Sequence, residues 1–299
     1  MTNRRDFLRY ATALAATLPL PVVLRAADEP PLPTRPIPGT DDRLPVVGLG
    51  NSQAFKDGDL ERTRTLFEFF HARGGAYVDV IGDARFVAAK AARDMGIQDD
   101  LFFGTYVLQK SDEADRIDAR KILAAQGKPT LDLVLSLDIA EYTRRADSFR
   151  RLKEEGLARY IGVARHRAEF HEPMMALMKA GAVDFVQVNY SMLEPQAGER
   201  LLPMARDLGV AILINRPFVN GDYFRLVKGK PLPEWAAEFD CQSWAQFSLK
   251  FILSHPAVNC VLTETANPKH ALDNLGGGFG RLPDEATRQR MLATIHGFV

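Results

Sequence analysis

The chain has 299 residues, of which 46% are hydrophobic and 25% charged, a composition that is ordinary for a globular protein with a substantial core. Lys and Arg together number 38, as do Asp and Glu, so the formal net charge is zero. This balance argues against a nucleic-acid-binding protein, which normally carries a basic excess. A small-molecule site is compatible with it.

The first 27 residues have the pattern of an export signal. The arginine pair at 4–5 precedes an apolar stretch at 10–24 and the small residues Ala26-Ala27. The stretch is shorter than the ~20 residues that a membrane-spanning helix needs, and the arginine pair resembles the twin-arginine motif that export machinery reads. We therefore expect a signal of this type, no stable membrane span, and a mature protein in the periplasm or outside the cell. The alternative is an ordinary exposed, basic N-terminus.

Residues 28–43 are rich in proline. Proline fixes φ and supplies no backbone donor, so this composition predicts a stiff, extended linker. A single domain then covers residues 44–299.

Within residues 44–299, short apolar runs alternate with longer amphipathic stretches. Unbroken apolar runs are typical of parallel strands that are covered on both faces. Eight such runs predict strands at 46–50, 77–81, 101–107, 131–137, 160–164, 185–190, 210–215 and 259–263. Helical periodicity is found at 59–72, 141–155, 173–179, 199–208, 242–254 and 284–296.

Eight uninterrupted βα units predict an α/β fold, a single-domain (β/α)8 TIM barrel. A doubly wound dinucleotide-binding sheet is disfavoured, because Gly48-Leu49-Gly50 is followed by Gln53 where that fingerprint needs glycine. In such barrels the ligand site lies at the C-terminal ends of the strands.

Two cysteines and several histidines are candidate reactive or metal-binding groups. Cys241 and Cys260 fall in a predicted helix and a predicted strand, where free cysteines usually pack as small apolar residues. A disulfide between them stays open. The histidines at 71, 166 and 171 lack the spacing of metal ligands, so we expect no metal.

Segments in order along the chain resemble the aldo-keto reductases. They are LPVVGLGNSQAF, GGAYVDV, LFFGTYV, TLDLVLSLDI, LKEEGLARYIGVAR, VDFVQVNYSMLEP and FILSHPAVNCVLTETANPKHALDNL. The N-terminal signal together with RPIP and LPVVGLG also resembles an exported subgroup of that family. The resemblance implies a (β/α)8 barrel and hydride transfer between NADPH and a carbonyl, with a tyrosine acid tuned by lysine, aspartate and histidine.

Three of those four catalytic residues are replaced. Asp79 stands where the family aspartate stands, but the tyrosine position is Ala84 and the lysine position is Tyr106. Leu137 replaces the histidine, or Ser136 or Asp138 if the register slips. Asp79 and Tyr106 are therefore the candidate catalytic residues.

The resemblance also implies contacts to NADP(H). Gln187 matches the family glutamine that helps to hold the nicotinamide amide, while Ala164-Arg165 replaces the family's Ser-Asn pair. Apart from the resemblance, a polar Gln187 inside an apolar strand needs a hydrogen-bond partner, and Arg165 either binds an anion or forms a surface ion pair. The candidate cofactor-binding residues are Gln187, Arg165, Asn215, Arg216, Thr265, Lys269, His270 and Asn274.

Two hypotheses follow. The first is an NADP-linked oxidoreductase for a carbonyl or alcohol, with the acid relocated to Tyr106 and its cation supplied by Arg85, Arg165 or Lys90. The second is a non-catalytic barrel that binds a small, possibly anionic ligand or a partner protein. Whether the chain is an enzyme stays open at this stage. Trp235 and Trp244, which follow the strand at 210–215, either roof the barrel opening or pack its wall.

Overall fold

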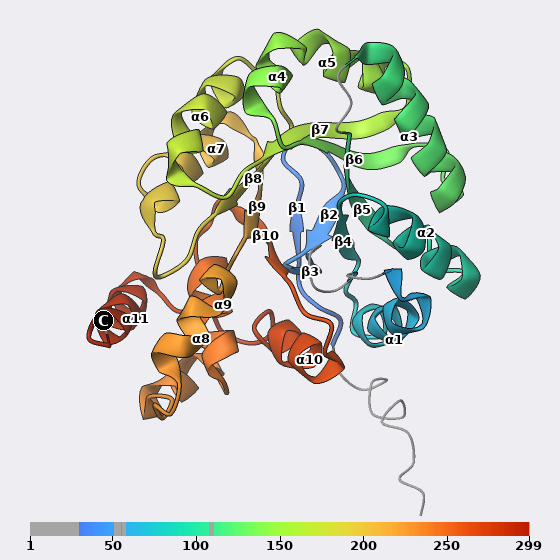
Figure 1. Cartoon of the computed structure of the whole chain (residues 1–299). Helices are drawn as coiled ribbons and strands as arrows, with labels where there is room; N and C mark the ends of the chain where they lie inside the picture. The colour runs from blue at the N-terminus through green and yellow to red at the C-terminus, as the bar shows by residue number, and fades with distance from the viewer. Residues whose placement is uncertain (1–29, 51–54, 56–57, 108–110, 299) are drawn as a thin grey trace, which may run out of the picture. The chain divides into compact units, whose positions relative to one another are not determined.

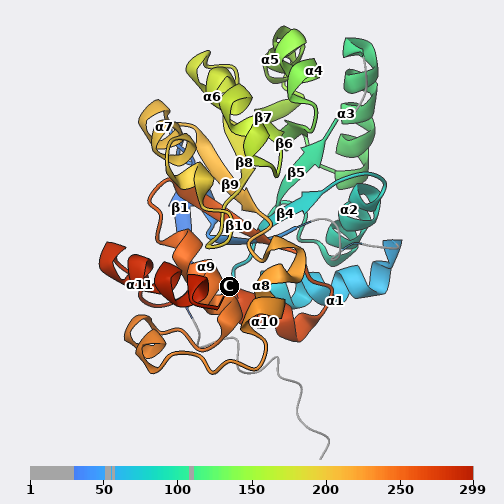
Figure 2. The same cartoon turned by 60° about the vertical axis from the view of Figure 1, so that its left-hand side comes forward.

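The structure, a computed structural model, describes residues 30–50, 55, 58–107 and 111–298. Residues 31–299 form one compact unit, a closed barrel of eight parallel strands with helices around it (Figures 1 and 2). The expected signal at 1–27 lies outside the described residues. The single-domain (β/α)8 barrel is confirmed.

All eight expected barrel strands are present, in the order in which they follow along the chain. They are β3 (Val47–Leu49), β4 (Tyr77–Val80), β5 (Phe102–Tyr106), β6 (Leu131–Ser136), β7 (Ala158–Ala164), β8 (Phe185–Asn189), β9 (Ala211–Asn215) and β10 (Val258–Thr263). β10 pairs with β3 and closes the ring.

Helices cover the outside of the ring. They are α1 (Leu60–His71), α2 (Ala84–Met95), α3 (Asp112–Gln126), α4 (Ile139–Arg144), α5 (Ala146–Glu154), α6 (His171–Lys179), α7 (Leu201–Leu208), α8 (Asp222–Val227), α9 (Trp244–Leu253), α10 (Pro268–Gly276) and α11 (Glu285–His296). Side-chain caps start several of them: Ser111 accepts from the amide of Ala114, and Ser243 from that of Gln246.

The predicted linker at 28–43 is wrong from residue 31 onward. Thr34–Pro36 (β1) and Arg43–Pro45 (β2) form an antiparallel hairpin, and Ile37 and Leu44 are 2% and 0% exposed. Both pack in the same apolar cluster as residues inside the barrel, such as Leu133. The hairpin therefore plugs the barrel. The proline count concealed the apolar residues that make this segment part of the core.

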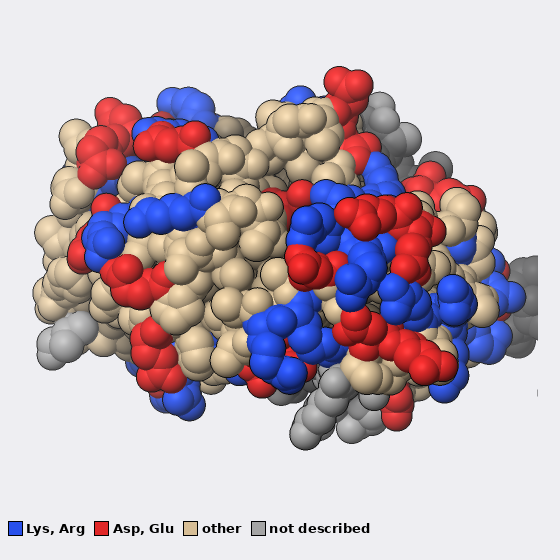
Figure 3. Space-filling model, turned by 90° about the horizontal axis from the view of Figure 1, so that it is seen from above, with Lys and Arg blue, Asp and Glu red and all other residues tan. Residues whose placement is uncertain are grey.

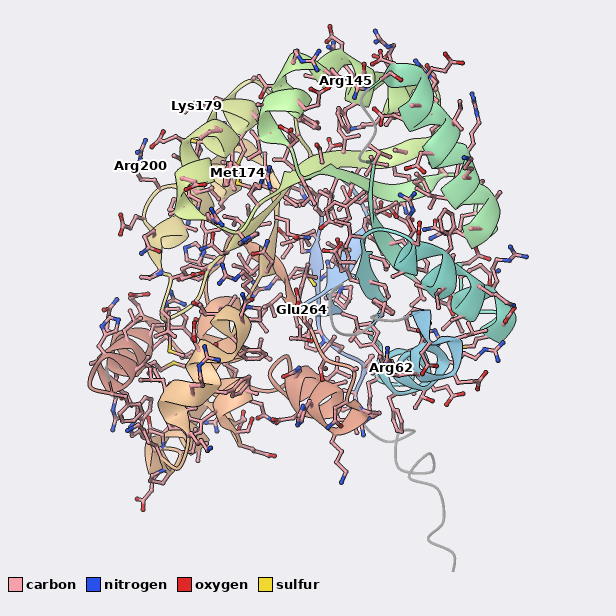
Figure 4. All side chains as sticks on the ribbon, in the orientation of Figure 1. Arg62, Arg145, Met174, Lys179, Arg200 and Glu264 are labelled. Atoms are coloured by element: carbon pink, nitrogen blue, oxygen red, sulfur yellow. The ribbon has the colours of Figure 1, made fainter. Side chains whose placement is uncertain are left out.

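A second correction concerns the helix expected at 141–155, which is two helices, α4 and α5. The break is at Arg145, whose backbone leaves the helical region (φ −119°, ψ 25°). Its guanidinium turns toward α3, where it pairs with Asp112 and with the buried Asp115 (Figure 4). Arg145 therefore ends α4 and separates it from α5, although the hydrophobic periodicity runs through both helices.

Aromatic rings fill the lower part of the barrel interior. Tyr77 and Phe102 stack at 5.6 Å between ring centroids, and Tyr160 meets Phe185 edge-on at 5.3 Å. Two residues beyond Tyr77 along β4, the inward position is occupied by Asp79. The polar residues of the site therefore lie above an apolar floor.

Charged side chains of both signs are interspersed on the face shown in Figure 3, in agreement with the zero net charge. No helix in the described part of the chain is long and apolar enough to cross a membrane. Those residues also contain no cluster of three His, Cys, Asp or Glu side chains that could hold a metal. Cys241 and Cys260 are both buried, free thiols, and Cys241 precedes α9 rather than lying in a helix.

Candidate active site

A buried hydrogen-bond network joins four strands at the C-terminal opening of the barrel. The Tyr106 hydroxyl lies 3.1 Å from Oδ2 of Asp79 and 3.2 Å from Oε1 of Gln187. The amide nitrogen of Gln187 donates to the same Asp79 oxygen, and Asn215 donates to Oε1 of Gln187 at 3.3 Å. Asp79, Tyr106 and Gln187 are 1%, 1% and 4% exposed. The hydrogen-bond partners expected for Gln187 are therefore Asp79, Tyr106 and Asn215.

The carboxyl group of Asp79 is poised near neutrality. Burial raises its pKa to about 7, hydrogen bonds from Gln187 and Tyr106 oppose the shift, and the charge of Glu264 adds to it. Oδ1 of Asp79 has no hydrogen-bond partner among the described residues. A buried carboxyl group with a free oxygen and a pKa near 7 can exchange a proton under ordinary conditions.

Tyr106 is unsuited to the relocated acid role that the sequence suggested. Burial raises the pKa of its phenol well above the usual value, and the neighbouring Asp79 adds to the shift. A phenol acts as an acid near neutrality only when a cation lowers its pKa. The chemistry of this pair therefore belongs to Asp79, with Tyr106 as its hydrogen-bond donor.

The sequence offered three cations, Arg85, Arg165 and Lys90, that could act on Tyr106. None of them contacts the Tyr106 hydroxyl or the Asp79 carboxyl group. Arg85 donates to the backbone carbonyl of Tyr106 at 2.8 Å and pairs with Asp118 at 2.7 Å. Lys90 pairs with Asp94 on the surface. Arg165 stacks on Phe170 at 4.7 Å from the ring centroid. Arg85 thus holds the end of β5 rather than the Tyr106 hydroxyl.

Arg165 and Asn215 face each other across the ends of β7 and β9. The amide nitrogen of Asn215 donates to the backbone carbonyl of Arg165 at 3.1 Å. Neither Nε of Arg165 nor Oδ1 of Asn215 has a hydrogen-bond partner in the described chain. Arg165 makes no ion pair with a described residue, so the alternative of a surface ion pair is not supported.

Two cavities lie among the segments that follow β9 and β10, and neither is lined by Asp79, Tyr106 or Gln187. The first has a volume of about 460 Å³ and is lined by Phe218, Phe224, Ser243, Trp244, Ala245, Glu264, Thr265, His270, Asp273 and Asn274. The second, of about 600 Å³, is lined by Arg216, Pro217, Phe218, Asn220, Gly221, Phe224 and Glu264. Phe218, Phe224 and Glu264 line both cavities.

The cofactor-binding candidates after β10 partly converge on the first cavity. Thr265, His270 and Asn274 line it, whereas Lys269 is exposed on the first turn of α10 and does not. Asn267 caps this helix by accepting from the amide of Lys269 at 3.0 Å. Trp244 also lines the cavity, while Trp235 packs against Phe247 at 5.7 Å. Of the two roles expected for the tryptophans, Trp244 therefore lies at the cavity and Trp235 packs in the wall.

The loop after β9 is held in an unusual backbone conformation. Arg216, Val219 and Asn220 have φ angles of 51°, 47° and 54°, a region that is a clear outlier for a β-branched residue such as Val219. Ser248 in α9 donates to the carbonyl of Pro217 at 2.9 Å and secures the loop. Strained loops of this kind often belong to ligand sites.

Glu264 and the two phenylalanines were missed in the sequence. Glu264 directly follows β10, so its position at a strand end was the available signal. Phe218 and Phe224 follow β9 in a loop and in α8, and no pattern in the sequence shows which way these rings point. Figure 4 shows Glu264 near the middle of the ring of strands, away from the outer helices.

Known proteins with the same fold include two aldo-keto reductases of known structure. The holo form of an aldo-keto reductase from Bacillus halodurans superposes with a TM-score of 0.73 at 18% identity, covering 88% of this chain and 96% of that one. An aldo/keto reductase from Klebsiella pneumoniae in complex with NADP and acetate gives a TM-score of 0.70 at 19% identity, with coverages of 85% and 94%.

Sequence comparison identifies the family. An aldo-keto reductase of Mycolicibacterium smegmatis is 27% identical over 266 residues, which are 82% of this chain and 86% of that protein. The model of the aldo/keto reductase family matches residues 86–289, more than half of this chain. The chain therefore belongs to the aldo/keto reductase family.

Proposed function

We propose that the protein is an NADP(H)-linked oxidoreductase of aldo-keto reductase type that acts on a carbonyl or alcohol, with Asp79 as its proton-exchanging group. The observation that carries this proposal is the buried pair of Asp79 and Tyr106, in which the carboxyl pKa is about 7. It is supported by the position of the pair, at the strand ends where barrel enzymes carry their chemistry.

The proton chemistry of the proposal rests on the carboxyl group of Asp79. When an alcohol is oxidised, the carboxylate accepts the hydroxyl proton; when a carbonyl is reduced, the protonated carboxyl group returns it. Tyr106 and Gln187 hold Oδ2, which fixes the orientation of the carboxyl group. NADP(H), when bound, supplies or accepts the hydride.

The residues around the first cavity fit most of a dinucleotide. Lys269 and His270 lie on the first turn of α10, where a helix N-terminus attracts phosphate, and Trp244 and Phe224 offer apolar walls for a base. Oδ1 of Asn215 is an unpaired acceptor that suits a carboxamide N–H. The carboxylates of Glu264 and Asp273, which both line this cavity, repel phosphate.

A second candidate function, a ligand-binding barrel without catalysis, is favoured by a different observation. Both amide atoms of Gln187 are already used by Asp79, Tyr106 and Asn215. In the family this side chain helps to hold the nicotinamide. No cation of a described residue contacts the Tyr106 hydroxyl, which favours the same alternative.

Titration of the protein with NADPH and NADP, followed by nicotinamide fluorescence, tests the proposal. Micromolar binding, with turnover of carbonyl or alcohol substrates that Asp79→Asn abolishes and Asp41→Asn preserves, is the expected result. Asp41 is an exposed matched control. No saturable binding up to about millimolar cofactor, equivalent to less than roughly 4 kcal/mol of affinity, would leave the ligand-binding barrel.

We also propose that residues 1–27 direct export through the twin-arginine machinery to the periplasm or beyond. Support comes from the sequence alone: an arginine pair, a short apolar stretch and Ala26-Ala27. Fractionation of bacteria that express the full chain tests this. Changing both Arg4 and Arg5 to Lys is expected to retain the protein in the cytoplasm, and unchanged export would contradict the proposal.

A further inference from the structure

The two cavities at the barrel opening meet at one acidic and two aromatic side chains. Phe218, Phe224 and Glu264 are the residues that line both cavities. The two rings lie 4.7 Å apart, centroid to centroid, with 43° between their planes. Phe224 is 41% exposed although it is large and apolar. A carboxylate beside two aromatic faces is the arrangement that attracts a positively charged nitrogen.

We propose that this junction of Phe218, Phe224 and Glu264 is a binding site for a cationic nitrogen, such as an ammonium group on a largely apolar ligand. The inference goes beyond the proposed function. The ligand is a substrate if the protein is an oxidoreductase, and simply the bound molecule if it is not.

The backbone under Glu264 is adapted to its side chain. The amide of Gly50, at the end of β3, donates to the carbonyl of Thr263 at 2.8 Å. A Cβ atom at Gly50 would lie 2.8 Å from Cγ of Glu264, a distance too short for two carbon atoms. Glycine at this position therefore lets the Glu264 side chain lie across the end of β3, at the junction of the two cavities.

The other charged or titratable side chains among the lining residues of the two cavities are Arg216, Asp273 and His270. Arg216 lines the second cavity, but its guanidinium lies 3.8 Å from the carboxylate of Glu194 and 3.3 Å from the side-chain oxygen of Asn220. Asp273 lines the first cavity and accepts only from the uncharged groups of Ser243 and Gln246 among the described residues. The charge of Glu264 also reaches the barrel interior, where it raises the pKa of Asp79.

The position of the Phe218 ring is fixed by the strained loop. The carbonyl of Phe218 accepts from the amides of Gly221 and Tyr223, at 2.9 and 3.3 Å. The Tyr223 ring stacks on Phe218 at 6.3 Å, and its hydroxyl donates to the carbonyl of Trp244 at 2.9 Å. A ring held in this way loses little freedom when a ligand binds.

A matched pair of probes tests the proposal by calorimetry. Benzyldimethyl(2-hydroxyethyl)ammonium carries the charge, and 3,3-dimethyl-4-phenylbutan-1-ol is its neutral isostere with carbon in place of nitrogen. We expect the cation to bind about tenfold more tightly to the full chain, from the combined attraction of a carboxylate and two rings. Equal affinities for the two probes would overturn the proposal.

Three variants locate the effect. Glu264→Gln keeps the shape of the side chain and removes its charge, and Phe224→Leu keeps an apolar group and removes the ring. Each is expected to reduce the preference for the cation by about threefold or more. Glu68→Gln, at an exposed position of α1, is the control for a change in net charge. An unchanged preference in Glu264→Gln would also overturn the proposal.

The same titrations with and without NADP separate this inference from the proposed function. Preference for the cation without any cofactor binding supports the ammonium site and contradicts the oxidoreductase. Cofactor binding with turnover of neutral alcohols only, and no preference for the cation, contradicts the ammonium site and leaves the oxidoreductase in place.

Discussion

The hydroxyl of Tyr106 lies 3.1 Å from Oδ2 of Asp79, and both side chains are 1% exposed. In this pair the carboxyl group of Asp79 accepts from a neutral hydroxyl donor. Burial raises the pKa of the carboxyl group from 3.8 to about 7, although the hydrogen bonds from Gln187 and Tyr106 oppose the shift. A cation next to an aspartate would instead lower the pKa of its carboxyl group.

The raised pKa of Asp79 predicts that stability falls as the pH rises. The folded state binds a proton between pH 3.8 and about 7 that the unfolded state has already released, so the penalty of burying the charge grows across this range and is complete above it. Asp79→Asn removes the titrating group. Relative to the native chain, we expect this variant to gain about 2 kcal/mol between pH 5 and pH 8.

Urea denaturation of both proteins at the two pH values measures this gain, with Asp41→Asn as an exposed control. Parallel pH dependences in the native chain and Asp79→Asn would show that Asp79 is not the group that titrates.

Tyr106→Phe is expected to raise the pKa of Asp79 further. The hydroxyl hydrogen bond lowers this pKa, so its loss shifts the titration upward by on the order of one pH unit, as a hydrogen bond to a charged group is worth about 1.5–3 kcal/mol. Carbon-13 NMR of the aspartate carboxyl groups follows the titration directly, without any assay of activity.

Tyr142→Phe is the matched control, because the Tyr142 hydroxyl donates to the carbonyl of Ala182 at 2.6 Å on the outside of the barrel. An Asp79 titration that is the same in both variants would mean that the Tyr106 hydroxyl does not affect the carboxyl group.

The strands and the barrel follow from the sequence because parallel strands covered on both faces are almost wholly apolar. The runs at 131–137 and 185–190 show this pattern, and β6 and β8 lie within them. The hairpin was not predicted because Ile37 is isolated between Pro36 and Pro38, with no periodicity to mark it.

The candidate site is only partly visible in the sequence. Asp79, Tyr106 and Gln187 could be found because inward positions at strand ends are set by the barrel register. The ring positions of Phe218 and Phe224 depend on a loop with positive φ angles at non-glycine residues. Local sequence does not encode such a loop, since contacts with α9 hold it in place.

Gly104 in β5 gives a prediction about packing inside the barrel. A Cβ atom there would lie 2.3 Å from the Tyr77 hydroxyl, which is buried and has no hydrogen-bond partner among the described residues. We expect Gly104→Ala to cost about 1–3 kcal/mol through overpacking. Tyr77→Phe alone is expected to be close to neutral, because it removes a buried hydroxyl that makes no hydrogen bond.

A double-mutant cycle with both changes isolates the contact. The pair is expected to regain at least about 1 kcal/mol relative to the sum of the single variants, because the clashing oxygen is gone. Additive free energies of unfolding would show that the hydroxyl is not what occupies the space above Gly104.

The hairpin offers the last prediction, because a flexible linker and a barrel plug respond differently to loss of one side chain. Leu44 is 0% exposed and packs with Ile37 and Leu133, so Leu44→Ala is expected to cost about 2–5 kcal/mol, as for a large-to-small change in a core. Denaturant unfolding of the chain from residue 31 measures it. Asp41→Ala, in the exposed turn of the same hairpin, is the control and is expected to change stability by less than about 0.5 kcal/mol. Equal, small effects at both positions would mean that residues 31–45 do not contribute to the core. The apolar interior of the barrel would then be formed by the side chains of its strands alone.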